Sequence, residues 1–313
     1  MAYSSDMWPR HQIWKMGGQP MRHPPDVVVW PGSEAEVAAV VRACSKYSVP
    51  IVPYGAGSGV CGGAVPIRGG VVVDMKRLNR FIEVDDHDLT VTAGPGIIGM
   101  HLEEELDARG YTLGHFPSSI VCSTLGGWLA ARSAGQFSSR YGKIEDMIVS
   151  MRVVLADGSI LETGPDQPFD WTQVIVGSEG ILGLITQATL RMHPKPESAA
   201  FRGYRFRNLE DAVRAVRLVM QAGLAPHVIR LYDPFDSLLH SSGGGQVSSM
   251  LDPIRDVLGG RVGAFGKRAS KKVGIAVALS VPAVLNKVVD SISASCLLIV
   301  GFEGHRRRVD EDM

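Results

Sequence analysis

The sequence PYGAGSG (Pro53–Gly59, the first loop) follows directly on the short apolar segment Ile51-Val52, as a loop follows a buried strand. Alternating glycines allow successive backbone N–H groups to curl around a phosphate, and the Ser58 hydroxyl adds a donor. The loop differs from a Rossmann fingerprint, because Val60 stands where the third glycine would open a helix. It also differs from a P-loop, since no Gly-Lys-Ser/Thr ending follows. The sequence predicts a phosphate-binding loop of another kind, with a glycine-rich hairpin that binds no ligand as the alternative.

Two further loops have a similar small and polar composition. In the second loop (Phe116–Gly127), Ser and Thr lead into a Gly-Gly pair at the start of an expected helix, where N–H groups and the helix dipole favour an anion. Arg132–Gly135 follows that helix and offers a charged donor. The third loop is Gly177–Gly183. A plain Ser/Thr cap would explain the second loop by itself, but three such loops favour one long ligand, such as a dinucleotide.

Four motifs stand in a fixed order along the chain: PYGAGS, then PSSIVCSTLGGW, then RSAG with YGKIED, then GSEGILGLIT. In this order they resemble the PCMH-type FAD-binding domain of the vanillyl-alcohol-oxidase flavoproteins, over about Pro25 to Pro194. A finer similarity is to the alkyldihydroxyacetonephosphate synthases and their bacterial FAD-linked oxidase relatives. It rests on Cys122–Trp128, Tyr141–Asp146, Ile229–Asp233 and Leu297–Gly304.

The resemblance implies an α+β fold with FAD as its cofactor. An N-terminal extension (residues 1–24) would precede a two-subdomain PCMH-type FAD-binding domain (25–196) and a partial α+β substrate or cap domain (197–313). Noncovalent binding is expected, because the first loop has no histidine and His115, before the second-loop serines, is interpreted as structural. The residues implied to bind FAD are Pro53, Tyr54, Gly55, Ala56, Gly57, Ser58, Gly59, Pro117, Ser118, Ser119, Ser123, Thr124, Gly127, Ala131, Arg132, Ser133, Ala134, Gly135, Glu179, Gly180 and Ile185.

For the function, the resemblance implies exchange of the acyl chain of acyl-dihydroxyacetone phosphate for a fatty alcohol, a reaction of ether-lipid synthesis. Arg230 matches an arginine on the side of the substrate phosphate, although a pair with Asp233 would explain it equally well. The family's catalytic tyrosine and histidine-rich loop would lie beyond residue 313, so no catalytic residue is assigned. Two alternatives stay open: an FAD-linked dehydrogenase of glycolate or D-lactate, and a chain that binds flavin without catalysis.

The composition argues against several other classes of protein. Lys plus Arg and Asp plus Glu both number 32, so the chain lacks the positive charge of a nucleic-acid binder. Four widely spaced cysteines without a CxxC pair predict neither disulfides nor a metal site, and suit the cytoplasm. The longest apolar run, Val273–Leu285, is shorter than the roughly 20 residues of a membrane span. The expected partner is a phosphorylated small molecule or lipid-like substrate, and a homodimer stays open.

Local patterns predict the elements around the loops. Residues 27–30 are expected to form a buried strand, and a helix over residues 98–109 is expected to leave Glu103–Glu105 largely in water. His193-Pro194-Lys195-Pro196 marks a boundary between two units, because two prolines interrupt any regular element.

The segment after this boundary predicts a strand followed by an amphipathic helix. Asn208 is expected to cap that helix, and Val213, Val216 and Val219 are expected to face its core.

Overall fold

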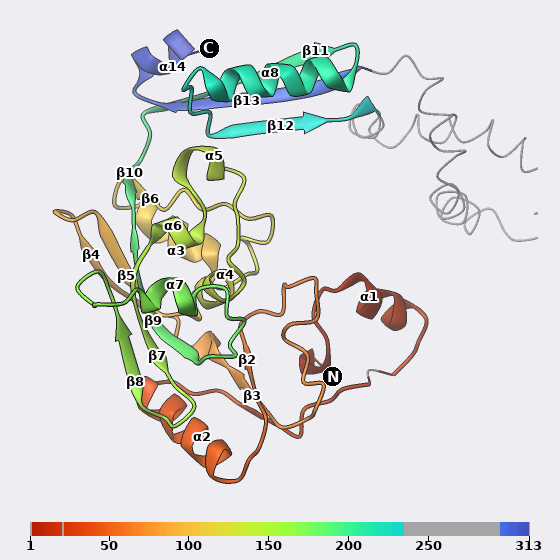
Figure 1. Cartoon of the computed structure of the whole chain (residues 1–313), viewed down its shortest axis with the longest axis vertical. Helices are drawn as coiled ribbons and strands as arrows, with labels where there is room; N and C mark the ends of the chain where they lie inside the picture. Colours follow the sequence, from red (N-terminus) through yellow and green to blue (C-terminus); the bar gives the residue numbers. More distant parts are fainter. Residues whose placement is uncertain (1, 21, 235–294, 313) are drawn as a thin grey trace, which may run out of the picture. The chain divides into compact units, whose positions relative to one another are not determined.

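The computed structural model describes residues 2–20, 22–234 and 295–312 (Figure 1). The chain divides into two compact units, Met1–Pro196 and Glu197–Met313. The apolar run Val273–Leu285 lies outside the described residues. Among the residues that are described, no helix is both long and apolar enough to cross a membrane.

A small parallel sheet begins the first unit, with strands in the order β1-β3-β2. Its elements are β1 (Val27–Val29), β2 (Ile51–Tyr54), β3 (Val71–Asp74) and the crossover helix α2 (Glu34–Lys46). The central strand is the buried one, since Val72 and Val73 have no exposed surface. Strand β1 lies at the sheet edge and Val27 is 51% exposed, so the prediction of a buried strand there was wrong. An apolar run alone does not distinguish an edge strand from a central one.

An antiparallel sheet of five strands forms the other half of the first unit, in the order β4-β5-β9-β7-β8. The strands are β4 (Phe81–Asp85), β5 (Thr90–Ala93), β7 (Ile148–Val154), β8 (Ile160–Thr163) and β9 (Leu184–Arg191). Asp157 Oδ1 accepts hydrogen bonds from the backbone N–H and hydroxyl of Ser159 and so fixes the β7–β8 turn.

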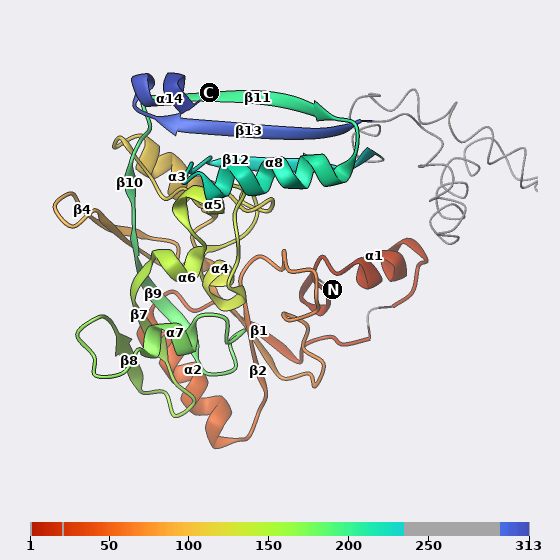
Figure 2. The same cartoon turned by 45° about the horizontal axis from the view of Figure 1, so that its top comes forward.

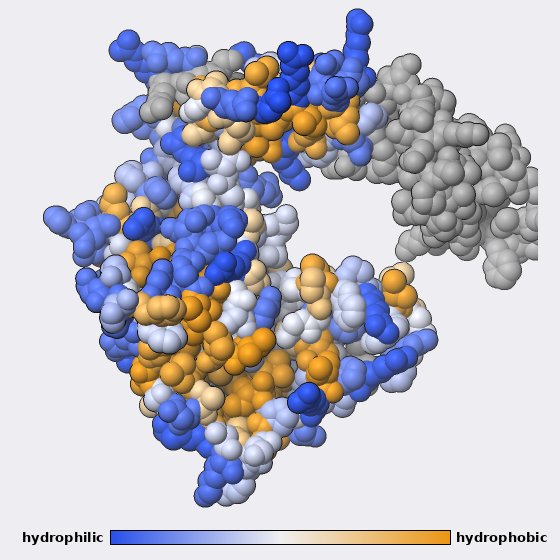
Figure 3. Space-filling view, viewed as in Figure 1, coloured by the Kyte–Doolittle hydropathy of each residue, from blue (hydrophilic) through white to orange (hydrophobic). Residues whose placement is uncertain are grey.

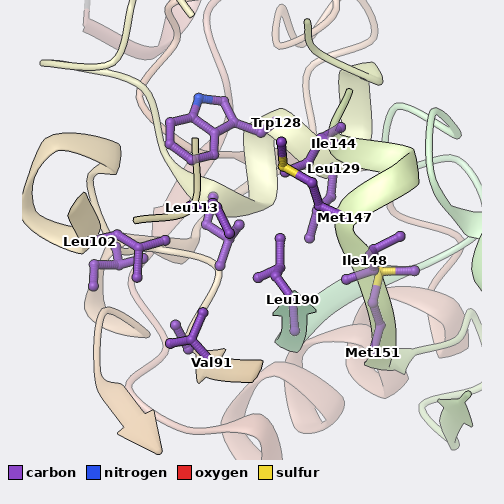
Figure 4. Close-up of a cluster of buried hydrophobic side chains, with 14 of the residues drawn as sticks. Val91, Leu102, Leu113, Trp128, Leu129, Ile144, Met147, Ile148, Met151 and Leu190 are labelled. Atoms are coloured by element: carbon purple, nitrogen blue, oxygen red, sulfur yellow. The ribbon is translucent and has the colours of Figure 1, made fainter. Parts of the chain in front are cut away.

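Helices cover this sheet and build the larger core with it (Figure 4). They are α3 (Gly99–Asp107), α4 (Leu125–Ala131) and α6 (Ile144–Met147). Trp128 of α4 lies among Leu113, Leu129 and Ile144, and its Nε1 donates to Ser123 Oγ at 2.7 Å. A second core joins the two sheets, because α2 packs against both β3 and the β7–β9 pair.

Short elements complete the first unit. They are η1 (Ala2–Ser4), α1 (Pro9–Met16), η2 (Met75–Arg77), β6 (Tyr111–Thr112), α5 (Ser138–Tyr141), α7 (Trp171–Ile175) and β10 (His193–Pro194). Strands β6 and β10 pair with one another, so the segment before the second loop is tied to the end of the unit.

Glu103 departs from the sequence-based expectation. It was expected in water, but only 6% of the residue is exposed. The chain returns over α3 after residue 110, and Glu103 accepts hydrogen bonds from Thr112 Oγ1 (2.9 Å) and the Leu113 N–H (3.1 Å). Burial raises the pKa of this carboxyl to about 7. Helical periodicity cannot show which neighbouring segment folds back over a helix, so the prediction was wrong for Glu103 while Glu104 is exposed as expected.

The second unit is a three-stranded antiparallel sheet with helices (Figures 1 and 2). Its elements are β11 (Ser198–Phe206), α8 (Leu209–Gln221), β12 (Val228–Tyr232), β13 (Cys296–Gly304) and α14 (Arg306–Asp312), with strands in the order β11-β13-β12. The Asn208 cap is confirmed, because its Oδ1 accepts from the Asp211 N–H at 2.8 Å. Val213 was wrongly expected in the core: it is 52% exposed, and its neighbour Ala212 is the buried residue. Val216 packs against the core of the second unit as predicted, together with Ala215, so of the three predicted valines only Val213 lies off the inward face of α8.

Candidate functional site

The first loop carries backbone donors that the protein itself does not use. Within the described residues, the N–H groups of Ala56, Gly57, Ser58 and Gly59 donate to no other residue. Gly57 has a φ of +66°, a conformation that favours glycine, and a Cβ there would overlap the hydroxyl of Tyr54. The loop therefore presents a run of N–H groups on a backbone whose path depends on glycine, as an anion-binding loop does.

A lysine that the sequence analysis missed lies against the carbonyl side of this loop. Lys76 Nζ donates to the Gly55 carbonyl at 2.8 Å and to Asp74 Oδ2 at 2.6 Å. The Asp74 side chain is fully buried and also accepts from the Tyr3 hydroxyl at 2.7 Å. Lys76 thus fixes the end of β2, with its charge paired to the Asp74 carboxylate. No sequence motif marks it, because it becomes a neighbour of Gly55 only through the parallel β2–β3 pairing.

The second loop packs directly against the first. A Cβ on Gly55 would overlap Thr124 Oγ1, so glycine is what allows the two loops to touch. Thr124 also caps α4, accepting from the Gly127 N–H at 3.3 Å. Ser123 is buried, with its hydroxyl donating to the Ser119 carbonyl, whereas Ser118 is exposed.

The third loop touches the first loop on its other side. A Cβ on Gly180 would overlap the Pro53 ring, and the backbone of Glu179 adopts a left-handed φ of +52°. The Glu179 N–H donates to the Ala130 carbonyl at 3.0 Å, which ties the loop to α4. The structure therefore brings all three predicted loops together within one unit.

Arg132 does not present its guanidinium in the way the sequence suggested. Its Nε donates to the Val176 carbonyl at 2.9 Å and its Nη2 to the Gln173 carbonyl at 2.8 Å, so it holds the end of α7. Ala131 and Ala134 are exposed beside it.

The side chains of His115 and of the predicted cofactor residue Ile185 point into the protein. His115 is completely buried, its Nε2 lies 2.7 Å from Ser133 Oγ, and its ring meets the edge of Trp128. Burial lowers the pKa of His115 to about 4, so the imidazole is neutral near pH 7. Gly135 packs on the Phe116 backbone, and the Ile185 side chain belongs to the larger core. Nδ1 of His115 is buried without a hydrogen-bond partner among the described residues, and the structural role of His115 stays a prediction.

Apolar side chains surround the third loop at the surface. Figure 3 shows them on the face that carries α7 and the segment after it. Ile181 is 85% exposed and Leu182 is 45% exposed, directly after Gly180. Exposed aliphatic groups beside a loop of this kind offer a flat apolar surface to an aromatic ring system.

Arg230 lies on β12 of the second unit. It is exposed, and its guanidinium lies 5.4 Å from the ring centroid of Tyr232. Among the described residues, no ion pair joins it to Asp233. In the same part of the chain, no group of three His, Cys, Asp or Glu side chains is placed to hold a metal ion.

The comparison with protein families identifies the ligand of the first unit. Residues 25–164 match the family model described as FAD binding domain. The chain contains an FAD-binding domain. FAD is therefore its cofactor, and the site described above fits it, since the three loops meet where glycines replace side chains and the N–H groups of Ala56–Gly59 are available to a pyrophosphate.

Curated relatives with this FAD-binding domain are enzymes. The chain is 35% identical over 297 residues to the alkyldihydroxyacetonephosphate synthase of Dictyostelium discoideum, covering 93% of this chain and 45% of that protein. It is 33% identical over 238 residues to the glycolate oxidase subunit GlcD of Bacillus subtilis, covering 74% of this chain and 48% of that protein.

Solved structures confirm the fold class. A structure of alkyldihydroxyacetonephosphate synthase matches with a TM-score of 0.78 at 32% identity, covering 99% of this chain and 52% of that one. The α+β architecture with a PCMH-type FAD-binding domain was predicted correctly. The chain spans about half the length of the relatives it matches.

Proposed function

We propose that the chain provides the FAD-binding part of an enzyme similar to alkyldihydroxyacetonephosphate synthase. Such an enzyme exchanges the acyl group of acyl-dihydroxyacetone phosphate for a long-chain alcohol and releases the fatty acid. The observation that carries the proposal is the extent of the similarity: it covers 93% of this chain for the Dictyostelium discoideum synthase and 74% for the Bacillus subtilis oxidase subunit. The longer match must include much of the second unit, which begins at Glu197.

The three loops divide the binding of FAD among them in this proposal. The N–H groups of Ala56–Gly59 and the Ser58 hydroxyl bind the pyrophosphate, and Lys76 holds the Gly55 carbonyl at the start of this stretch. The second loop supplies the exposed Ser118 and the half-buried Ser119, and the exposed Ile181 supports a ring of the cofactor. FAD, when bound, supplies a ring system that accepts an electron pair. The binding is noncovalent, because no histidine lies in the first loop.

Arg230 binds the substrate phosphate in this proposal. Its guanidinium is exposed and oriented by the ring of Tyr232, which leaves its N–H fork able to bind a phosphate through two parallel hydrogen bonds. Arg230 therefore supports a phosphorylated substrate, and the lipid chain of that substrate is proposed from the similarity to the synthase.

A dehydrogenase of 2-hydroxyacids is the second candidate, because the similarity to glycolate oxidase subunit GlcD is nearly as high, at 33% identity. A 34% identity to the mitochondrial D-lactate dehydrogenase (cytochrome) of Arabidopsis thaliana over 216 residues points the same way. The two candidates differ in the electron balance. A dehydrogenase reduces its flavin with glycolate or D-lactate, whereas the acyl-to-alkyl exchange leaves the flavin oxidised.

The first experiment concerns the cofactor. The purified chain should show a flavin absorption spectrum, and acid precipitation should leave the flavin in the supernatant as FAD. Flavin that stays with the pellet would contradict noncovalent binding, and a chain that cannot be loaded with FAD would contradict the proposal.

The second experiment separates the two reactions. Under anaerobic conditions, dihydroxyacetone phosphate should leave the flavin oxidised, and Arg230→Ala should weaken the binding of dihydroxyacetone phosphate measured by equilibrium dialysis. Arg205→Ala is the matched control, since Arg205 is also exposed and lies on β11 of the same sheet. Bleaching by glycolate or D-lactate would favour the dehydrogenase instead.

A further inference from the structure

The segment from Tyr3 to His11 is bound to the first loop, although the FAD-binding family model begins only at residue 25. The Met7 N–H donates to the carbonyls of both Gly57 and Gly59, at 3.1 and 3.0 Å. Both acceptors belong to the stretch whose own N–H groups donate to no other described residue. The N-terminal segment therefore holds the carbonyl side of the loop and leaves the N–H side available.

Asp6 completes this attachment from inside the protein. Its side chain is fully buried, and Oδ2 accepts from the Gly62 N–H at 2.7 Å. Oδ1 accepts from the Trp8 N–H at 3.0 Å and lies 2.8 Å from Nδ1 of His11, itself only 4% exposed in its side chain. One buried carboxylate thus joins the N-terminal segment to the end of the glycine-rich stretch, three residues beyond Gly59.

We propose that Asp6 is a positioning residue for FAD. Together with the Met7 N–H it fixes both ends of Gly57–Gly62, so that the N–H groups of Ala56–Gly59 are arranged before the pyrophosphate arrives. Asp6 acts through the loop and does not contact the cofactor. A loop fixed in its binding conformation loses less entropy when the ligand binds, so preorganisation appears as affinity. This inference rests on the proposal that the first loop binds the FAD pyrophosphate.

The test measures the affinity of the flavin-free full chain for FAD and for riboflavin, which has the same ring system but lacks both the pyrophosphate and the adenosine. Asp6→Ala should weaken FAD binding about tenfold or more, because it removes hydrogen bonds of a charged group. Riboflavin has no pyrophosphate for the first loop to bind, so its affinity should change less than about twofold.

Asp26→Ala is the matched control. The Asp26 carboxylate also accepts from a glycine N–H of the same unit, that of Gly70 at 2.6 Å, but it does not touch the first loop. It should leave the affinity for FAD unchanged.

A backbone variant covers the case in which Asp6→Ala does not fold. Met7→Pro removes the N–H that donates to Gly57 and Gly59, while the side chain it replaces is 54% exposed. Met7→Ala retains the N–H and is its control. Met7→Pro should lower the affinity for FAD relative to Met7→Ala, again without an equal change for riboflavin.

The outcomes separate the inference from the function on which it rests. A wild-type chain that binds FAD no tighter than riboflavin would overturn the pyrophosphate assignment and, with it, the role of Asp6. If the wild type prefers FAD but Asp6→Ala and Met7→Pro keep that preference, the assignment stands and the positioning role is wrong. An equal loss for both ligands would likewise show that Asp6 only supports the fold.

Discussion

The first and second loops touch at Gly55 and Thr124 but satisfy their backbones in opposite ways. In the second loop, backbone N–H groups donate to carbonyls of the chain itself. The N–H of Ser123 donates to the Ser119 carbonyl. At the start of α4, the N–H of Leu125 donates to Ile97 and that of Gly126 to Pro95. In the first loop, four successive N–H groups have no acceptor among the described residues. A loop that is internally paired serves as a scaffold. Ala56–Ser58 are half-buried and Gly59 is exposed, so the first loop, held from its carbonyl side, can offer these N–H groups to an anion.

The largest effect is expected where the second loop meets the core. Trp128→Ala should destabilise the first unit by about 3–5 kcal/mol, because it leaves a cavity at a residue that is 2% exposed and removes the Nε1 hydrogen bond to Ser123. Urea unfolding measures the loss. Trp171→Ala, at a tryptophan that is 41% exposed, is the control and should cost less than about 1 kcal/mol. Equal effects of the two variants would show that the second loop is not the scaffold described here.

Glu103 gives a pH-dependent test of the same scaffold, since it binds the segment that enters the second loop. Its pKa in the folded protein, about 7, lies above the ordinary value of 4.5, so the folded state retains a proton that the unfolded chain releases. Stability contributed by this group therefore falls as the pH rises from about 4.5 to about 7, by roughly 3 kcal/mol in total.

Glu103→Gln removes this titration. The variant should gain stability relative to the wild type as the pH rises through that range, measured by urea unfolding at several pH values. Glu104→Gln on the exposed side of α3 should show a constant difference from the wild type. A constant difference for Glu103→Gln as well would mean that its carboxyl is ionised in the folded protein throughout.

The glycine loops and the cap at Asn208 could be predicted because each depends on residues close together in the chain, whereas the FAD-binding fold was predicted from the resemblance of four ordered motifs to a known family. Gly57 is an example: its role follows from the conformation of its own backbone. The contributions of Asp6, Lys76 and Glu103 depend on contacts across 56, 21 and 10 residues of sequence, and periodicity carries no information about such contacts. The only local feature of Asp6 is that its carboxylate accepts a hydrogen bond from the Trp8 N–H, two positions later. Such a bond is typical of a turn and does not indicate a ligand site.

The affinity for FAD should be sensitive to a single methyl group added to the first loop. Gly57→Ala places a Cβ against the Tyr54 hydroxyl on a backbone with positive φ, and should weaken FAD binding about tenfold or more. Gly110→Ala is the control, because Gly110 has a φ of +84° and nothing within 4 Å of its added Cβ. It carries the same backbone cost without altering the loop. Unchanged affinity in Gly57→Ala, measured by flavin titration, would place the pyrophosphate elsewhere.

The smallest expected effect compares one serine from each loop. Ser58 Oγ has no hydrogen-bond partner among the described residues, whereas Ser123 Oγ donates to the Ser119 carbonyl and accepts from Trp128 Nε1. Ser58→Ala should therefore weaken FAD binding about fivefold, the value of one hydrogen bond, with no change in the free energy of unfolding of the apoprotein.

Ser123→Ala should lower the stability and leave the affinity for FAD unchanged in the folded fraction. The free energy of unfolding should fall by about 1–3 kcal/mol, because the substitution leaves the buried indole N–H of Trp128 unpaired. Flavin titration measures the affinity of each variant for FAD, and urea unfolding measures its stability. The comparison of the loops requires that Ser58→Ala lowers the affinity alone and that Ser123→Ala lowers the stability alone. If Ser58→Ala destabilised the apoprotein and kept its affinity, the first loop would be a second scaffold, and its unpaired N–H groups would serve only to bind water.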